Sequence, residues 1–167
     1  MSDLSDPPAI FIPTPRHAVL QQLLQYWQGK RGTRAAPARG DIRPSEIKAL
    51  LPDVMMWNVN TSGERFTMRL VGENIVRFVG GNYTGKPATI NMPPDAAAAM
   101  IDILTQVVES KAPRFRIGRA FWLQEKALRP FEACYLPLSP DDETVDMILG
   151  GVKFDFTPSS ALSLGRT

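Results

Sequence analysis

Residues 65–81 constrain the fold most strongly, because they predict a strand that runs directly into a helix. Phe66, Met68 and Leu70 alternate with polar residues, which is the period of a strand with one buried face. The apolar residues that follow recur at helical spacing, and the glycine pair at 80–81 predicts the end of that helix. Neither element can bury its apolar side alone, so we expect the helix to pack on the strand.

Other segments also have the alternation or the β-branched and aromatic content of strands. Residues 54–59 precede a turn at 61–64 and should pair with residues 65–70 as a hairpin. Three more β-like segments lie toward the C-terminus and cover residues 114–123, 127–138 and 145–156. We therefore expect five antiparallel strands.

The apolar residues of the last segment change phase in its middle. Met147 and Leu149 share one face of an extended chain, whereas Val152 and Phe154 fall on the other. In a sheet with one buried face, a slip of one residue would expose a whole set of these side chains. Because two glycines stand at the change, we predict a β-bulge or a sharp bend at residues 150–151.

Three segments have helical patterns. Thr14, followed by proline, predicts the start of an amphipathic helix that ends at Gly29, with leucines and Trp27 on one side and glutamines on the other. Such a helix can pack on a sheet or on a second copy of itself. Residues 44–51 predict a short helix, and residues 95–111 predict a long one. The apolar stripe of the long helix comprises Ala97, Met100, Ile101, Leu104, Val107 and Val108.

The composition is typical of a soluble globular domain, since 44% of the 167 residues are hydrophobic and 22% are charged. A net charge of +2 is too small to favour nucleic acid or an anionic membrane as the main partner. No run approaches the roughly 18 apolar residues of a membrane span. The acidic N-terminus is unlike a signal peptide, so we expect a cytoplasmic protein. A single cysteine, Cys134, and a single histidine, His17, favour neither a disulfide framework nor a zinc site.

Several short segments occur here in a specific combination. The most specific is Arg-Leu-Val-Gly at residues 69–72, which runs into a helix and is followed by Thr84 and Gly85. The other segments are residues 24–27, 41–47, 50–52, 75–80, 136–139 and 148–151. Together with the order of the elements, they resemble a PAS domain, and within it the single-domain PAS-like family found mostly in alphaproteobacteria.

The resemblance implies an α+β fold with a five-stranded antiparallel sheet in the order 2-1-5-4-3 and helices on one face. Residues 72–112 would roof that face. The implied regions are an N-terminal extension with the first two helices (1–51), a PAS-like core (52–156) and a flexible tail (157–167). The first 13 residues are expected to be mostly flexible, with the apolar residues at their end touching the surface.

The resemblance also implies a sensory or interaction module with a small cavity between its helices and its sheet. Other PAS families hold haem, flavin, a small metabolite or nothing there. A haem would want an axial histidine on or near the long helix, whereas His17 stands in the N-terminal extension. A flavin photosensor would want a reactive cysteine among the helices, whereas Cys134 stands in a strand, where we expect an inert buried thiol. Both departures argue against these cofactors and leave a small apolar or amphipathic ligand, or an empty core.

Eight residues are candidates for the lining of this cavity: Met68, Ile75, Phe78, Met100, Leu104, Cys134, Leu136 and Leu149. The same residues would serve as plain hydrophobic core, because a core and an apolar pocket share one composition. Five residues are candidates for an interface: Leu20, Leu23, Tyr26, Trp27 and Trp122. The first four mark the N-terminal helix as a dimerisation element, so we expect a chain without residues 1–28 to fold as a monomer. Trp122 is a contact residue if it points outward and a core residue if it points inward.

Three charged clusters each allow a functional and a plain interpretation. Arg114, Arg116 and Arg119 could meet an acidic ligand, but the wet face of an edge strand accounts for most of this charge. The basic loop at 29–43 could bind an anion or nucleic acid, but it has no interleaved aromatic residues, which favours a solvated connector. The acidic turn at 141–143 could hold a carboxylate pair, but its Ser-Pro-Asp-Asp setting favours a solvated loop.

We therefore expect a stand-alone sensory or regulatory module that acts by ligand binding, protein contact or both, without catalysis. Because no output segment is left once the PAS-like core is assigned, it should act as a homodimer or on a separate signalling protein. The alternative is a small enzyme, an isomerase or dehydratase, on a cone of sheet and helices. Such an enzyme needs a titratable group with a shifted pKa in its pocket, and Glu73, Glu132 and Tyr135 are the candidates.

Overall fold

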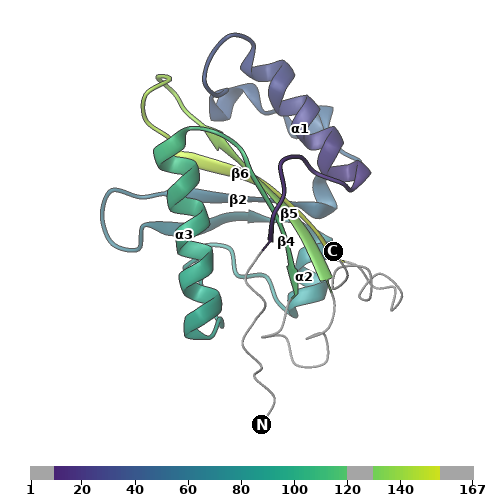
Figure 1. The fold of residues 1–167 in the computed structure, drawn as a ribbon, viewed down its shortest axis with the longest axis vertical. Helices are drawn as coiled ribbons and strands as arrows, with labels where there is room; N and C mark the ends of the chain where they lie inside the picture. The colour runs from purple at the N-terminus through teal and green to yellow at the C-terminus, as the bar shows by residue number, and fades with distance from the viewer. Residues whose placement is uncertain (1–9, 120–129, 155–167) are drawn as a thin grey trace.

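The computed structural model of the protein describes residues 10–119 and 130–154 (Figure 1). Its helices are α1 (Ala18–Arg31), α2 (Glu73–Val79) and α3 (Pro94–Ser110), with 3₁₀ turns η1 (Arg39–Asp41), η2 (Pro44–Glu46) and η3 (Leu51–Asp53). Its strands are β1 (Ile10–Phe11), β2 (Val54–Val59), β3 (Phe66–Val71), β4 (Arg114–Arg119), β5 (Pro130–Leu138) and β6 (Met147–Phe154). The expectations for residues 1–9, for Trp122 and for the tail at 157–167 lie outside the described residues.

The strands form one antiparallel sheet in the order β1-β4-β5-β6-β2-β3. The five strands from β3 back to β4 have the expected order 2-1-5-4-3, and β1 adds a sixth at the edge. The two residues of β1 fall in the expected flexible lead, yet they pair with Arg116 and Ile117 of β4. Ile12 extends this contact, because its side chain is buried and its backbone N–H donates to the Phe115 carbonyl at 3.1 Å.

Both faces of the sheet are covered, and each carries its own hydrophobic core (Figure 1). On one face, called here the α3 face, residues of α2 and α3 pack on Trp57, Phe131 and Tyr135 of the strands. On the other, called the α1 face, α1 and the segment of 3₁₀ turns pack on Leu136 and Leu149. The sheet expected from the sequence has helices on one face, and α1 supplies the cover of the second.

The N-terminal helix therefore packs on its own sheet. Leu20, Leu23 and Trp27 are each at most 1% exposed. The indole Nε1–H of Trp27 donates to the Pro137 carbonyl of β5 at 2.8 Å, so the helix is joined to the sheet by a buried hydrogen bond as well as by packing. These three side chains are core residues of this chain, which corrects the expectation that they form a dimer surface.

The start of α1 is stabilised from β5. The helix begins after His17 rather than at Thr14, and His17 caps it because Nδ1 accepts the Val19 N–H at 3.1 Å. The carboxylate of Glu132 accepts the backbone N–H groups of Arg16 at 2.7 Å and His17 at 3.1 Å. A negative charge at a helix N-terminus is favourable because the helix dipole is positive there.

The last strand has no bulge at residues 150–151, because its register with β2 and with β5 is continuous. Met147 and Leu149 belong to the core of the α1 face, whereas Ile148 and Val152 belong to the core of the α3 face. The predicted bulge is wrong because it assumed a sheet with one buried face. With both faces buried, neither set of side chains is exposed.

The register shift of the sheet lies in β3 instead. Trp57 pairs with Met68, whereas Met56 pairs with Leu70, so Arg69 is the extra residue of a β-bulge. The shift turns Leu70 toward the core of the α1 face, while Met68 stays in the core of the α3 face. The expectation that Leu70 and Met68 share a face is wrong for this reason.

The helices α2 and α3 lie close to their predicted bounds. α2 ends at Val79 and is capped by Gly80, whose φ of +86° is a left-handed conformation that glycine adopts without strain. The buried stripe of α3 includes Met100, Leu104 and Val107 as expected. It differs elsewhere, because Ala96 and Ile103 are also buried, whereas Ile101 is 39% exposed and Ala97 and Val108 are half-buried. Residues 44–51 form 3₁₀ turns in place of the expected short helix.

Candidate functional site

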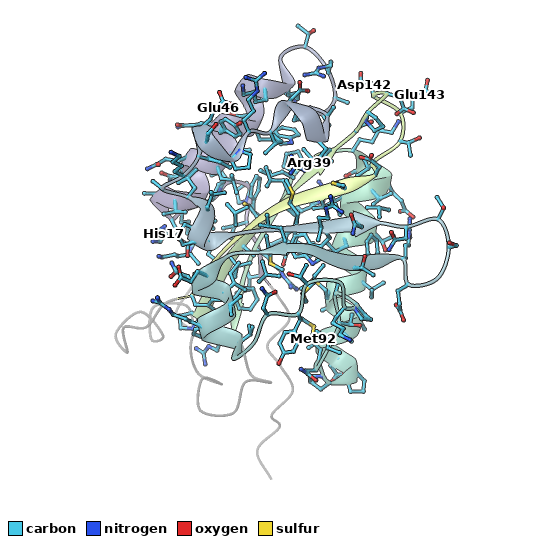
Figure 2. All side chains as sticks on the ribbon, turned by 180° about the vertical axis from the view of Figure 1, so that it is seen from behind. His17, Arg39, Glu46, Met92, Asp142 and Glu143 are labelled. Atoms are coloured by element: carbon cyan, nitrogen blue, oxygen red, sulfur yellow. The ribbon has the colours of Figure 1, made fainter. Side chains whose placement is uncertain are left out.

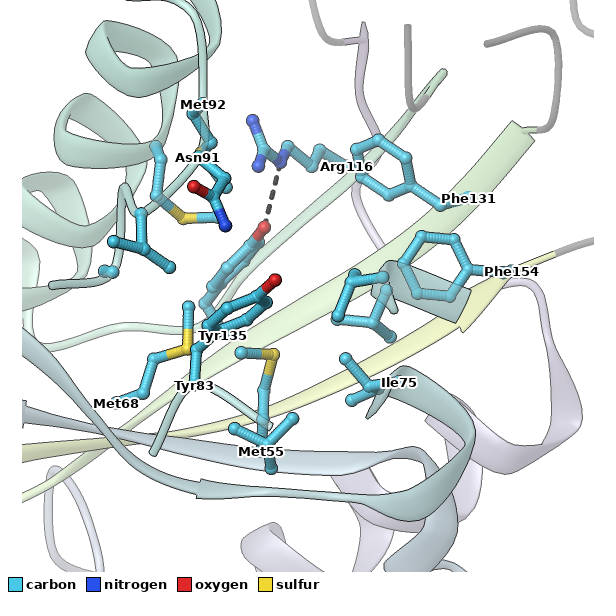
Figure 3. Close-up of a pocket in the computed structure, with 16 residues that line it drawn as sticks. Met55, Met68, Ile75, Tyr83, Asn91, Met92, Arg116, Phe131, Tyr135 and Phe154 are labelled. Carbon is cyan, nitrogen blue, oxygen red and sulfur yellow. Dashed lines mark hydrogen bonds between the residues drawn. The ribbon is translucent and has the colours of Figure 1, made fainter. Parts of the chain in front are cut away.

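A pocket lies on the α3 face of the sheet, closed by α2, α3 and the segment 83–92 (Figure 3). Its cavity volume is about 100 Å³, and its wall is mainly apolar. The lining residues are Met55, Met68, Val71, Ile75, Val79, Tyr83, Ala88, Ile90, Asn91, Met92, Met100, Arg116, Phe131, Tyr135, Val152 and Phe154. This is the position in which the resemblance to PAS domains implies a ligand cavity.

Three of the eight predicted lining residues, Met68, Ile75 and Met100, line this pocket. Two more, Phe78 and Leu104, are fully buried in the core of the same face without lining the pocket. They hold α2 and α3 on the sheet.

The other three predicted residues, Cys134, Leu136 and Leu149, lie on the opposite face, in the core beneath α1. Their assignment to the pocket is corrected by the alternation of β5 and, for Leu149, by that of β6, whose Val152 lines the pocket instead. In that strand Phe131 and Tyr135 point to the pocket, so that Cys134 and Leu136 point away from it. The sequence shows which residues share a side of a strand, but a strand apolar on both sides leaves open which side faces the helices.

Arg116 is a polar residue of the pocket that the sequence did not predict. Alternation on an edge strand suggested that its side chain would lie on the solvent-exposed face. The side chain is instead 5% exposed and lines the pocket. Its Nε–H donates to the Tyr135 hydroxyl oxygen at 2.9 Å. The guanidinium carbon lies 5.4 Å from the ring centre of Phe131 and 5.5 Å from that of Tyr135. The sequence carries no signal for this burial, since the apolar neighbours Phe115 and Ile117 place Arg116 on the other side of an alternating strand.

Tyr135 is the second polar group of the pocket. Burial raises the pKa of its phenol, and the charge and hydrogen bond of Arg116 act in the opposite direction. Because the net direction is upward, the phenol is neutral at ordinary pH and keeps its proton while it accepts from Arg116. Figure 3 shows the Asn91 amide and the Tyr83 hydroxyl also directed into the pocket. The pocket thus combines an apolar wall with a small group of polar atoms near Arg116.

The two residues considered for cofactor chemistry lie away from the pocket. Cys134 is fully buried on the α1 face, and burial raises the pKa of its thiol to about 12. A thiol on that face cannot reach a group bound between the sheet and α3, so the residues present do not fit a thiol-reactive flavin. His17 is occupied as the N-cap of α1, on the side of the sheet that α1 covers.

The three residues considered for an enzyme are dispersed. Tyr135 lines the pocket, whereas Glu132 binds the start of α1 on the opposite face. Glu73 is exposed and pairs with Arg77 at 2.8 Å, one turn further along α2. The pocket lining within residues 10–119 and 130–154 contains no aspartate, glutamate or histidine.

The basic loop is partly neutralised by nearby carboxylates. Lys30 pairs with Glu46 at 3.1 Å, and Arg34 pairs with Asp41 at 3.0 Å. Tyr26, another of the interface candidates, joins this group, because its hydroxyl donates to the Glu46 carboxylate at 3.0 Å. The loop therefore carries less free charge than its sequence suggests.

The acidic turn between β5 and β6 is a structural turn. Asp141 Oδ1 accepts the backbone N–H groups of Glu143 at 3.0 Å and Thr144 at 2.8 Å, and Asp142 Oδ1 accepts the Ala35 N–H at 2.7 Å. Figure 2 shows this turn at the opposite end of the molecule from Met92 of the pocket. In the part of the chain that the structure describes, no group of three metal-ligating side chains occurs, and no helix is long and apolar enough to span a membrane.

Comparisons with solved structures identify similar folds. One is a light-oxygen-voltage domain described with a flavin analogue, with a TM-score of 0.51 and 10% identity, covering 73% of this chain and 92% of that one. The light-oxygen-voltage protein of Rhodobacter sphaeroides has a TM-score of 0.50 and 13% identity, covering 67% of this chain and 64% of that one. The light-state structure of the light-oxygen-voltage domain of the blue-light photoreceptor Aureochrome1 has a TM-score of 0.50 and 8% identity, covering 72% of this chain and 94% of that one. At these identities the likeness shows the fold alone.

The sequence comparisons address the family. No curated protein matches the sequence. A family model described as PAS domain matches residues 15–153, a region that begins just before α1 and includes the whole pocket lining except Phe154. The narrower resemblance to an alphaproteobacterial family stays a prediction. Since the matched region covers most of the chain and the five strands from β2 to β6 have the PAS order, the chain belongs to the PAS domain family.

Proposed function

We propose that this protein is a sensory module that binds a small, mainly apolar ligand in the pocket of the α3 face and signals by protein contact, without catalysing a reaction. Membership in the PAS domain family supports the sensory role. The single observation that most supports ligand binding is the cavity of about 100 Å³ on the α3 face. Concave, mostly apolar sites with a few polar groups are the usual form of small-molecule sites.

The wall of the pocket is suited to a ligand that arrives and leaves. Met55, Met68, Met92 and Met100 all line it. Methionine side chains are unbranched and have several rotatable bonds, so they can adapt to a guest and close over its absence. A cavity with such walls can respond to occupancy by a shift of the surrounding segments.

The output is proposed to pass by contact, either within a homodimer or to a separate signalling protein. Leu20 and Leu23 of α1 are buried in this chain and do not offer that surface. Among the described residues, the large apolar side chains that remain exposed are Ile10, Phe11 and Ile101. Ile10 and Phe11 form β1 at one edge of the sheet, and a sheet edge can accept a strand of another chain.

Ligand binding is tested with neutral apolar probes. We expect hexanol, indole or toluene to bind the purified chain in titration calorimetry, and Ala88→Leu to abolish that binding because the added side chain fills the cavity. The matched control is Ala98→Leu, an exposed position of α3 outside the pocket lining, which should bind the probes as the parent does. Native mass spectrometry of the same preparation reports any co-purified molecule and the oligomeric state.

Two results would contradict the proposal. One is the absence of both a co-purified molecule and any probe binding. The other is equal binding by the parent chain and Ala88→Leu, which would place the probes outside this pocket.

A further inference from the structure

Arg116 places a positive charge inside an apolar pocket. Its side chain is 5% exposed, and the acceptor of its Nε–H is a neutral hydroxyl rather than a carboxylate. Within residues 10–119 and 130–154, the ion pairs involve other groups, and no carboxylate pairs with Arg116. A buried charge is costly unless an opposite charge or several hydrogen bonds compensate it. Among the described residues, the cation in the pocket therefore has no counter-charge.

The surroundings of the guanidinium compensate it only in part. The rings of Phe131 and Tyr135 lie near it, with centres 5.4 Å and 5.5 Å from the guanidinium carbon, and the faces of such rings attract cations. These groups are neutral, so they lower the cost of burial without supplying an anion. The site thus favours a negatively charged guest over an empty or purely apolar one.

The geometry of the remaining donors matches a carboxylate. Arginine has five N–H donors in a planar fork, and only Nε is used by Tyr135. The terminal amino groups point into the space that Figure 3 shows beside Asn91. A carboxylate can accept two parallel bonds from such a fork. The Tyr135 hydroxyl accepts from Arg116, which leaves its own proton to donate to a ligand oxygen.

We infer that the pocket binds a small carboxylate with an apolar body, with the carboxylate on Arg116 and Tyr135 and the body among Met55, Met68 and Met100. This inference rests on the proposed function, and it adds the chemical class of the ligand. The cavity of about 100 Å³ limits the body to a short alkyl chain or a single ring, because an apolar cavity of about 150 Å³ accommodates benzene.

The test compares acids with their neutral counterparts on the full chain. Hexanoate, benzoate and phenylacetate are each titrated against hexanol, benzyl alcohol and phenylethanol at pH 7 by calorimetry. We expect at least one acid to bind about 10 to 100 times more tightly than its alcohol, which is the contribution of a buried charge-assisted hydrogen bond. This comparison needs no variant, so it is informative even where a substitution disturbs folding.

Two variants and a control locate the effect. Arg116→Met keeps the length and apolar stem of the side chain, and it should remove the preference for the acid while leaving the alcohol bound. Tyr135→Phe should lower the affinity for the acid by a smaller factor than Arg116→Met does, because it removes only one neutral donor. The matched control is Arg114→Met on the same strand, outside the pocket lining, which should leave both affinities unchanged.

The outcomes separate this inference from the proposed function. Suppose that alcohols bind, that Ala88→Leu abolishes their binding, and that no acid binds more tightly than its alcohol. The carboxylate assignment is then wrong, whereas binding of an apolar ligand in the pocket is supported. An acid preference that survives Arg116→Met would also overturn the assignment to Arg116. If neither acids nor alcohols bind, the proposed function itself falls.

Discussion

At the scale of residues, Gly150 and Gly151 show how two close contacts select one residue type. A Cβ on Gly150 would overlap the ring of Trp57 on the α3 face, and one on Gly151 would lie 2.7 Å from Leu20 Cδ2 on the α1 face. The two glycines therefore admit a tryptophan on one face and α1 on the other. The sequence shows the glycine pair clearly, but a pair of glycines is equally typical of a bulge, and only the contacts on both faces separate the two interpretations.

A substitution tests this reading. Gly150→Ala should destabilise the fold by about 1–3 kcal/mol, because the new methyl group must displace the buried Trp57 ring. Gly29→Ala is the matched control, since its Cβ would meet nothing within 4 Å inside α1, and it should stabilise the fold by about 0.5–1 kcal/mol. Urea unfolding measures both changes. An unchanged midpoint for Gly150→Ala would mean that Trp57 is free to move.

Arg116 marks the limit of sequence reasoning at the same scale. Its strand, its alternation with Phe115 and Ile117, and the acidic ligand as one interpretation of its cluster could all be stated from the sequence. Its burial could not, because it depends on β1, which turns β4 from an edge strand into an interior one. A two-residue strand has too short a pattern to be recognised by periodicity.

At the scale of elements, the sequence predicts well where helices and strands lie along the chain, but it predicts poorly which face of the sheet a given side chain lies on. The strands β2 and β3 and the helices α2 and α3 lie near their expected bounds, because each has a period of its own. The face that each strand turns to each helix depends on contacts between distant segments. That is why Cys134, Leu136 and Leu149 fall beneath α1 rather than beside the pocket.

The role of α1 gives a prediction that reverses the expectation from the sequence. Removal of residues 1–28 should leave a chain without a cooperative unfolding transition, because it uncovers the apolar α1 face of the sheet. The point substitution Leu23→Ala should lower the free energy of unfolding by about 2–5 kcal/mol, as expected for a buried leucine. Gln22→Ala, on the exposed side of the same helix, should leave the free energy of unfolding within about 0.5 kcal/mol of that of the parent.

Circular dichroism during urea unfolding checks both. A folded, monomeric protein after the deletion, or a Leu23→Ala variant as stable as Gln22→Ala, would mean that α1 is not part of the core.

At the scale of the whole molecule, one sheet separates two cores with different properties. The core of the α1 face is closed by a helix with a buried hydrogen bond, from Trp27 to the Pro137 carbonyl. The core of the α3 face contains the cavity, four methionines and the segment 83–92. The proposed ligand would therefore act on the side lined by adaptable methionines, while the other side holds the sheet in place.

This division predicts where a ligand changes local stability. With the acid that binds most tightly, amide hydrogen exchange should slow in α2, in residues 83–92 and in α3, because bound ligand stabilises the segments that contact it. Exchange in α1 should stay unchanged, since α1 contacts only the opposite face. Arg116→Met with the same acid is the control and should show little slowing in any segment. Equal slowing in α1 would contradict this division and would indicate that occupancy is transmitted from the α3 face to the α1 face, through the sheet or through the hydrogen bond between Asn74 of α2 and Asp53 of η3.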